Sequence, residues 1–271
     1  MNASRRGGVR RRRDDAPPPH PLLWIAGAVG LAFVGLPLLG LVTEAPWSRW
    51  LDLVTSPAVA EAARLSLLIP LAAAALAFVV GAPVGQLLAA RFPGRGVRRT
   101  RVVLPIVLPP VVGGMALLAA LGPDGVLGSL LARSGIVLTG TATGAILAGA
   151  FVAFPLVVLA AESGFRSLDA SLAEAAATLG ASRWYAFRRI ALPSLRPQLL
   201  AAITLAWARA LGEFGATATF AGTVPGRTAT LPLTIYAVKE ADPGAAIALS
   251  LLLVVISAAV LIPLRDRILA R

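Results

Sequence analysis

Apolar runs alternate with short polar stretches along nearly the whole chain, and each run continues for about 20 residues with almost no charge, the length of helix that crosses roughly 30 Å of hydrocarbon. Lipid offers no partner to a free backbone amide or carbonyl, so each run is expected to be helical. The pattern therefore predicts an all-α integral membrane protein with six transmembrane helices: Leu22–Val42, Leu65–Ala90, Val102–Leu121, Gly144–Ala161, Leu199–Ala221 and Gly244–Leu264.

The polar stretches between these runs divide the chain into a leader and one domain. Residues 1–20 combine arginine, aspartate and proline and have little to bury, which predicts a disordered basic cytoplasmic leader. Residues 21–271 are expected to form a single transmembrane domain, packed closely because its helices are rich in Ala and Gly. The connections on the outer side are short and carry turn signals, so they leave no room for a soluble catalytic domain.

Charge sets the orientation of this domain. The net charge is +12, and the arginines lie before the first run, between the second and third, between the fourth and fifth, and at the end of the chain. The positive-inside rule then places both termini in the cytoplasm. The Arg10–Arg13 run could also suggest nucleic acid, but a topology signal or contact with anionic membrane lipid explains it better, because no soluble basic face with interleaved aromatic residues accompanies it.

The chemistry available to the chain is limited. It has no cysteine, its single histidine is His20 in the leader, and it has no phosphate-binding loop of the G-x-x-x-x-G-K-[ST] type. We therefore expect no metal site, no catalytic residue and no ATPase site in this chain. An intramembrane enzyme would need a nucleophile and a base, or a metal cluster, facing each other within the spans. That class and a scaffold without chemistry of its own both stay open at this point.

The loop between the fourth and fifth runs, about residues 162–197, predicts two short helices. Ser171 and Glu174 have the S-x-x-E spacing of a capping box, which starts a helix. Gly180 is expected to end that helix in a left-handed conformation. Ser182 is expected to cap a second helix and Pro193 to end it.

These two helices present different surfaces. The second carries Trp184, Phe187 and an arginine pair, whereas the first carries an apolar strip of mostly small side chains. The pair could press against another protein or lie on lipid headgroups. The strip of the first helix consists of Leu168, Leu172, Ala175, Ala176 and Leu179.

The same loop resembles the motif found in the inner-membrane subunits of prokaryotic ABC importers. The motif reads Glu174-Ala175-Ala176, three residues, Gly180, nine residues, and Ile190-x-Leu192-Pro193. The resemblance implies that the loop docks in a groove of a separate cytoplasmic ATPase, which binds ATP and Mg. The residues it assigns to coupling are Glu174, Ala175, Ala176, Leu179, Gly180, Ile190, Leu192 and Pro193.

Three further segments are similar to the sulfate and molybdate permeases of that family: Leu108–Gly113 (LPPVVG), Ala208–Thr217 (ARALGEFGAT) and Thr230–Tyr236 (TLPLTIY). The combination of GEFGAT and TLPL-x-IY resembles the molybdate branch. It implies two copies of this chain, two ATPase copies, an extracytoplasmic oxyanion-binding protein, and molybdate or tungstate as cargo. A sulfate or thiosulfate permease, and a pair of two different permeases, are the alternatives within the family.

Two features inside the spans are candidates for the transport step. Arg209 and Glu213 stand four residues apart near the middle of the fifth run, where each charge would cost about 3 kcal/mol if it faced lipid. They form either an ion pair that fixes helix packing or a path for the anion, lined by Arg209 and held in place by Glu213. Thr217 could contact the oxyanion through its hydroxyl, unless that hydroxyl bonds back to its own helix.

Prolines interrupt the third run. Pro109 and Pro110, followed by Gly113, predict a kinked or partly unwound helix. A hinge or gate is the functional interpretation, and ordinary kinking in a packed bundle is the alternative.

Overall fold

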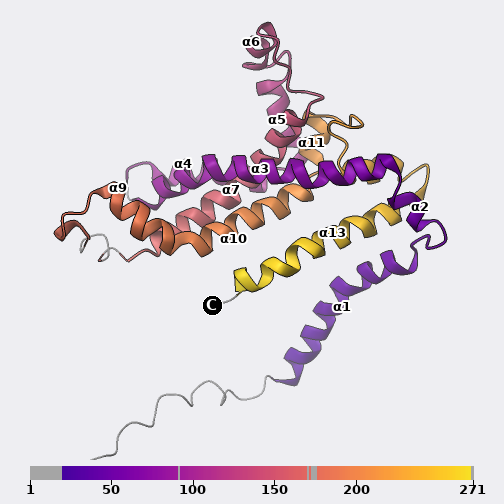
Figure 1. Cartoon of the computed structure of the whole chain (residues 1–271), viewed down its shortest axis with the longest axis horizontal. Coiled ribbons are helices and arrows are strands. Elements are labelled where there is room, and N and C mark those ends of the chain that lie inside the picture. Colours follow the sequence, from indigo (N-terminus) through magenta and orange to yellow (C-terminus); the bar gives the residue numbers. More distant parts are fainter. Residues whose placement is uncertain (1–19, 91, 170, 172–175, 270–271) are drawn as a thin grey trace, which may run out of the picture. The chain divides into compact units, whose positions relative to one another are not determined.

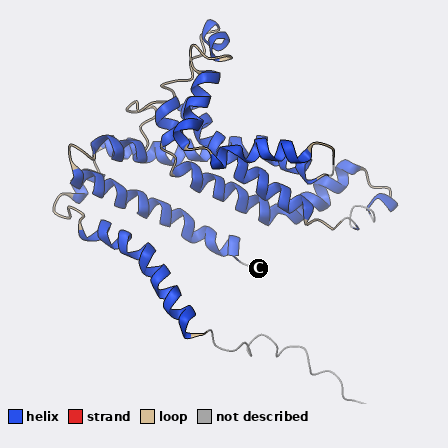
Figure 2. Cartoon of the chain, turned by 180° about the vertical axis from the view of Figure 1, so that it is seen from behind, coloured by secondary structure: helices blue, strands red, loops and turns tan. Residues whose placement is uncertain are grey.

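The structure, a computed structural model, describes residues 20–90, 92–169, 171 and 176–269. All regular elements in this part of the chain are helices, and Figure 2 shows no strand among them. The chain divides into two units, Met1–Glu44 and Ala45–Arg271, which are described separately. The expected all-α class is thereby confirmed.

The first unit contains helix α1, Pro21–Thr43. His20 caps it, because its Nδ1 accepts a hydrogen bond from the Leu22 backbone N–H at 3.3 Å. Pro21 stands in the first turn, where its missing N–H costs nothing. No residue of α1 is buried within this unit.

The second unit holds the other long helices: α3 (Pro57–Ala89), α7 (Ala142–Arg166), α10 (Leu192–Leu211) and α13 (Pro243–Leu269). Within the described residues, five helices including α1 are long and apolar enough to cross a membrane. A sixth span results if the bent pair α4 (Arg95–Val107) and α5 (Pro110–Leu121) is counted as one. The expected number of six therefore depends on that pair.

Helices α3, α7 and α10 pack side by side and form the centre of this unit (Figure 1). Their interface is lined mainly by alanine, including Ala73, Ala153 and Ala206, each fully buried. At Gly85 a Cβ atom would lie 2.6 Å from the Cβ of Ala161, so only glycine permits this approach of α3 to α7. Small residues at helix crossings are what close packing in a membrane requires.

The third predicted run is broken, as its prolines indicated. Helices α4 and α5 meet at Leu108 and Pro109 with a bend of 115°. Leu108 is extended because a residue that precedes proline is disfavoured in the helical region, and Pro109 and Pro110 donate no backbone hydrogen bond. Two helices thus replace the single helix expected at Val102–Leu121.

The fifth predicted run is broken as well, which the sequence did not predict. Helix α10 ends at Leu211, and a separate short helix, α11, runs over Gly215–Phe220. The Glu213 carboxylate accepts the Ala216 backbone N–H at 2.9 Å and so caps α11. Glu213 therefore starts a new helix, and the expectation that it lies in the middle of a continuous one is wrong.

Short helices occupy connections that were expected to contain turns. Asp242, before α13, pairs with Arg49 at 2.6 Å and accepts the Ala245 backbone N–H at 2.9 Å. The Ala245 hydrogen bond, followed by that of Arg49, holds the pKa of Asp242 below its usual range.

Helix α3 begins at Pro57 rather than Leu65. The short helices are α2 (Trp50–Val54), α6 (Gly128–Arg133) and α12 (Leu231–Val238).

Candidate functional site

The loop after α7 begins with an aspartate cap. The Asp169 carboxylate accepts a hydrogen bond from the Ser171 backbone N–H at 2.9 Å. This bond, together with a second one from the Ser171 hydroxyl, lowers the pKa of Asp169. Ser171 is already helical. The cap at this end is therefore Asp169 and not Ser171, while Glu174 and Ala175 of the predicted motif lie outside the described residues.

Gly180 ends the first segment as predicted. Its φ is +78°, in the left-handed region that favours glycine. Its N–H donates to the Ala177 carbonyl, and the Ala181 N–H donates to the Ala176 carbonyl, both at 3.0 Å. This pair of bonds is the Schellman motif, which satisfies the last carbonyls of a helix and turns the chain.

The second segment begins as predicted and ends differently. The Ser182 hydroxyl accepts the Tyr185 backbone N–H at 3.2 Å and caps α9, Arg183–Ala186. The chain then passes through one π-helical stretch, η1 (Phe187–Ala191), directly into α10. Pro193 does not end the helix, because it falls in the first turn of α10, after a widened turn in which the Leu192 N–H reaches the Phe187 carbonyl.

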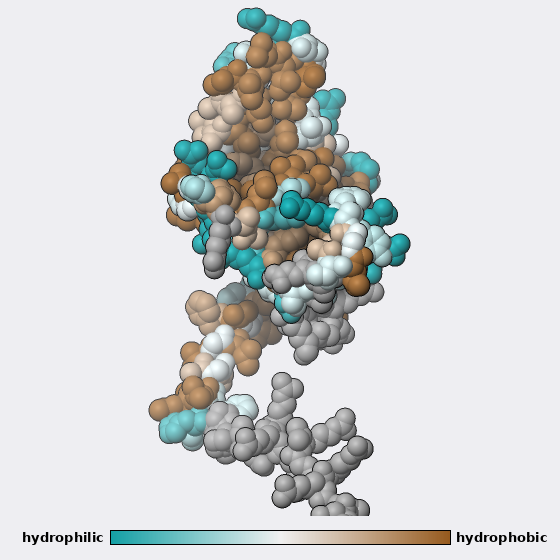
Figure 3. All heavy atoms as spheres, turned by 90° about the vertical axis from the view of Figure 1, so that its left-hand side faces the viewer, coloured by the Kyte–Doolittle hydropathy of each residue, from teal (hydrophilic) through white to brown (hydrophobic). Residues whose placement is uncertain are grey.

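The tip of this loop exposes large apolar side chains. Leu179 is 88% exposed, Trp184 67% and Tyr185 55%. Ala176, Leu179, Gly180 and Ile190, all predicted coupling residues, line one open hollow of about 760 Å³, and Leu192 and Pro193 are not part of it. Figure 3, which faces the end of the second unit that carries α9, shows that hydrophilic side chains otherwise gather there.

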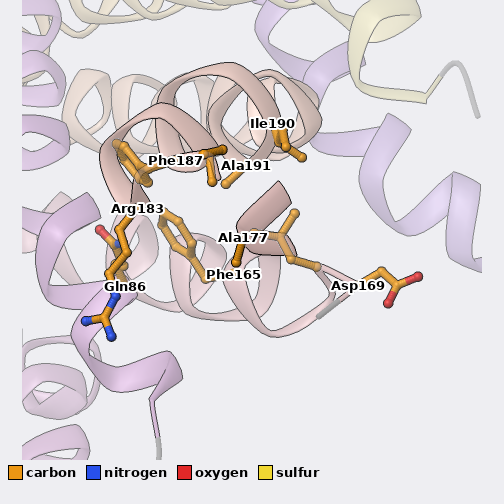
Figure 4. Close-up of a pocket in the computed structure, with 11 residues that line it drawn as sticks. Gln86, Phe165, Asp169, Ala177, Arg183, Phe187, Ile190 and Ala191 are labelled. Carbon is orange, nitrogen blue, oxygen red and sulfur yellow. The ribbon is translucent and has the colours of Figure 1, made fainter. Parts of the chain in front are cut away.

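A second hollow, of about 420 Å³, lies between this loop and the end of α7 (Figure 4). Phe165 of α7 and Phe187 of η1 stack across it with ring centroids 6.4 Å apart. Ala177, Arg183 and Asp169 also line it. The aromatic contact packs the loop against α7, the span that precedes it.

The predicted intramembrane charges are paired. Arg209 Nη1 lies 2.7 Å from Glu213 Oε2, and the Arg209 side chain is 37% exposed whereas that of Glu213 is 2% exposed. Thr217 is buried, and Thr219 donates its hydroxyl back to the Gly215 carbonyl at 2.7 Å. Of these residues, Arg209 is the one that presents a charge to the surface of this unit.

The breaks in the third and fifth runs meet. A Cβ on Gly215, at the start of α11, would lie 2.8 Å from the Cβ of Pro110, and one on Gly114 would lie 2.9 Å from the Ala216 carbonyl. A Cβ on Gly113 would likewise lie 3.1 Å from the ring of Phe151 in α7. Of the predicted hinge residues, Pro110 thus packs directly on the segment that follows the Arg209–Glu213 pair. Interrupted helices of this kind surround the substrate sites of many transporters.

Sequence reasoning missed an ionic cluster at the end of α7. Glu162, with a side chain 3% exposed, lies 2.6 Å from Arg95, 3.0 Å from Arg99 and 3.6 Å from Arg166. The arginines were interpreted only as orientation signals. Their pairing with Glu162 was not predicted because two of them are more than 60 residues from it in sequence. Only the spacing of Glu162 and Arg166, four residues apart, could have indicated it.

This architecture of long apolar helices, with one sharply bent span and an exposed polar loop between two of the others, is that of a multi-span membrane permease. Residues 77–269 match the family model of the binding-protein-dependent transport system inner membrane component. The chain belongs to this family and is a transport subunit of the membrane.

Relatives and solved structures agree with this family. A molybdenum transport system permease protein, ModB, of Mycobacterium tuberculosis is 42% identical over 250 residues, covering 90% of this chain and 94% of the relative. The sulfate transport system permease protein CysT of Salmonella typhimurium is 36% identical over 220 residues, covering 79% of each. The crystal structure of a bacterial alginate ABC transporter, in complex with a pentasaccharide-bound periplasmic protein, shares the fold with a TM-score of 0.70 at 19% identity, covering 91% and 93%.

Proposed function

We propose that this chain is the membrane-spanning subunit of an ATP-driven importer and that the loop of about residues 162–197 docks on a separate cytoplasmic ATPase. The observation that carries the proposal is the loop itself, with its Schellman turn at Gly180, its Ser182 cap and its exposed Leu179 and Trp184. Exposed apolar side chains beside polar ones suit a protein interface. In this account the partner binds ATP and Mg, and the chain has no ATPase site of its own.

The proposed cargo is molybdate, with tungstate as a related oxyanion. Support comes from the GEFGAT and TLPL-x-IY segments and from the higher identity to the molybdenum permease, 42%, than to the sulfate permease, 36%. A sulfate or thiosulfate permease is the second candidate, because the sulfate relative still covers 79% of the chain.

The proposed assembly has two copies of this chain, two ATPase subunits and an extracytoplasmic binding protein, in the inner membrane of a prokaryote. Six spans would put both termini on the same side of the membrane, and the arginines of α4 and of the loop at about residues 162–197 favour the cytoplasmic side. The leader, residues 1–20, then contributes to orientation.

The proposed path for the anion passes Arg209. Its side chain is 37% exposed, whereas the Glu213 side chain is buried and carries the same sign of charge as the anion. Glu213 holds the guanidinium in place, and the Pro109–Pro110 break beside α11 provides the hinge, with Gly113 packed against α7. Thr217 is buried, so any contact with the anion would require movement of α11.

The docking proposal is tested by capture of the ATPase on the purified chain. Gly180→Pro should lower the recovered ATPase at least about tenfold, because proline is fixed near a φ of about −65° and donates no hydrogen bond. Gly135→Pro is the matched control, since Gly135 has a φ of +76° and likewise donates to a carbonyl three residues back, at 3.0 Å. Equal recovery with Gly180→Pro would show that the loop is not the docking site.

A further inference from the structure

Glu162 joins two helices that are far apart in sequence. Its Oε1 pairs with Arg95 and its Oε2 with Arg99, both in the first turns of α4, at 2.6 and 3.0 Å. No residue of α4 is classed as buried, so apolar packing alone gives this helix little hold on the bundle. The two ion pairs are therefore the specific contacts that fix the start of α4 to α7.

Each helix leads to a different part of the proposed transport machinery. Four residues after Glu162, α7 ends at Arg166, and Asp169 opens the coupling loop. At its other end, α4 runs into the Leu108–Pro109 break and α5, which packs on α11. The cluster thus links the end of α7, next to the coupling loop, to the first helix of the broken third span.

Helix α3 packs closely on the turn of α7 that carries Glu162. A Cβ on Gly85 of α3 would lie 2.9 Å from the Glu162 backbone nitrogen. The ion pairs of the Glu162 side chain then link this turn of α7 to the start of α4.

The cluster is not a balanced structural pair. Three guanidinium groups surround one carboxylate, and the Arg95 Nε is buried without a hydrogen-bond partner. Arg99 and Arg166 are about half exposed, at 52% and 45%, so they can exchange the carboxylate for water. Arg95, whose side chain is the least exposed of the three, therefore makes the contact with Glu162 for which water competes least.

We propose that Glu162 is a positioning residue that transmits movement of the coupling loop to the broken third span through Arg95 and Arg99. This inference rests on the proposed function. Without the Glu162 carboxylate, the ATPase still docks on the loop and hydrolyses ATP, but α4 no longer follows α7.

The test compares molybdate uptake per ATP hydrolysed in vesicles that contain the assembled complex. Glu162→Gln should retain bound ATPase and ATP hydrolysis but lower uptake per ATP about tenfold. The control is Glu61→Gln, which removes an exposed carboxylate that pairs with Arg64 within the same helix, and uptake per ATP should be unchanged. Arg99→Gln should lower uptake per ATP by less, because Arg95 still holds the carboxylate. Arg99→Lys should recover part of the uptake per ATP that Arg99→Gln loses.

Two outcomes would overturn this inference. One is an unchanged uptake per ATP in Glu162→Gln, and the other is a parallel fall of ATPase binding and uptake, which a purely structural role would produce. If Glu162→Gln does not fold, Arg99→Gln decides by the same ratio. Failure of the proposed function would instead appear in the native complex, as an absence of ATP-dependent uptake.

Discussion

Arg209 and Glu213 show how one buried carboxylate can serve two purposes. Glu213 pairs with Arg209 at 2.7 Å and also caps α11 through the Ala216 N–H. Removal of one partner of a buried pair leaves an uncompensated charge, which typically costs about 3–5 kcal/mol. Arg209→Gln alone would therefore impair both packing and any role in the anion path.

The double variant Arg209→Gln/Glu213→Gln separates these two roles. It removes both charges and leaves no uncompensated carboxylate, so thermal stability should recover relative to Arg209→Gln. Uptake should stay low if Arg209 lines the path. Recovery of uptake together with stability, measured in reconstituted vesicles, would reduce the pair to a packing role.

Asp169 provides a second test at the scale of the residue. Loss of a helix cap costs about 1 kcal/mol, or roughly a fivefold change in an opening equilibrium. Asp169→Ala should thus speed amide hydrogen exchange at residues 176–178 about fivefold, whereas Asp169→Asn, which keeps an acceptor, should change it little. Equal exchange in the alanine variant would show that the cap does not hold this segment.

The same cap predicts the pH range over which this segment keeps its stability. The pKa of Asp169 in the folded loop is lowered, so its stabilisation is complete above the ordinary carboxyl pKa of about 4 and is lost as the pH falls through the lower folded value. Exchange at residues 176–178, corrected for its intrinsic pH dependence, should therefore be constant from pH 7 to about pH 5.

At the scale of the element, the α3–α7 crossing makes a prediction with a built-in control. A Cβ at Gly85 would lie 2.7 Å from the Val158 carbonyl, whereas one at Gly96 of α4 meets nothing within 4 Å. Gly85→Ala should lower the melting temperature, since overpacking costs about 1–3 kcal/mol. Gly96→Ala should leave it unchanged or raise it slightly. An unchanged melting temperature in Gly85→Ala would contradict the close crossing.

Local signals in the sequence predicted the elements well where the determinants were neighbours. Gly180 and Ser182 end and begin their helices as expected, because each acts on backbone groups within a few residues. The proline break in the third run was predicted for the same reason. The prediction that Pro193 ends the second helix was wrong, because a π turn without a local sequence signature lets this helix continue into α10.

Long-range pairing limited what could be predicted of the site. Glu162 meets Arg95 and Arg99 across more than 60 residues of sequence. A count of charges cannot reveal such meetings. The coupling loop was predictable in outline, whereas the ionic cluster that adjoins it was not.

At the scale of the whole molecule, the central question is whether transport needs an energy source. Moving a divalent anion inward against an interior-negative potential of about 100 mV costs about 4.6 kcal/mol. A thousandfold accumulation adds about 4 kcal/mol. Through a passive pore the accumulated anion would flow back out, because inward movement costs free energy. The account therefore requires coupling to ATP through the loop.

Uptake of molybdate into vesicles that contain this chain, its ATPase and its binding protein tests that claim most directly. The account predicts uptake that requires ATP, requires the ATPase, and exceeds the uptake of sulfate under the same conditions. Molybdate uptake that proceeds equally without ATP or without the ATPase would contradict it.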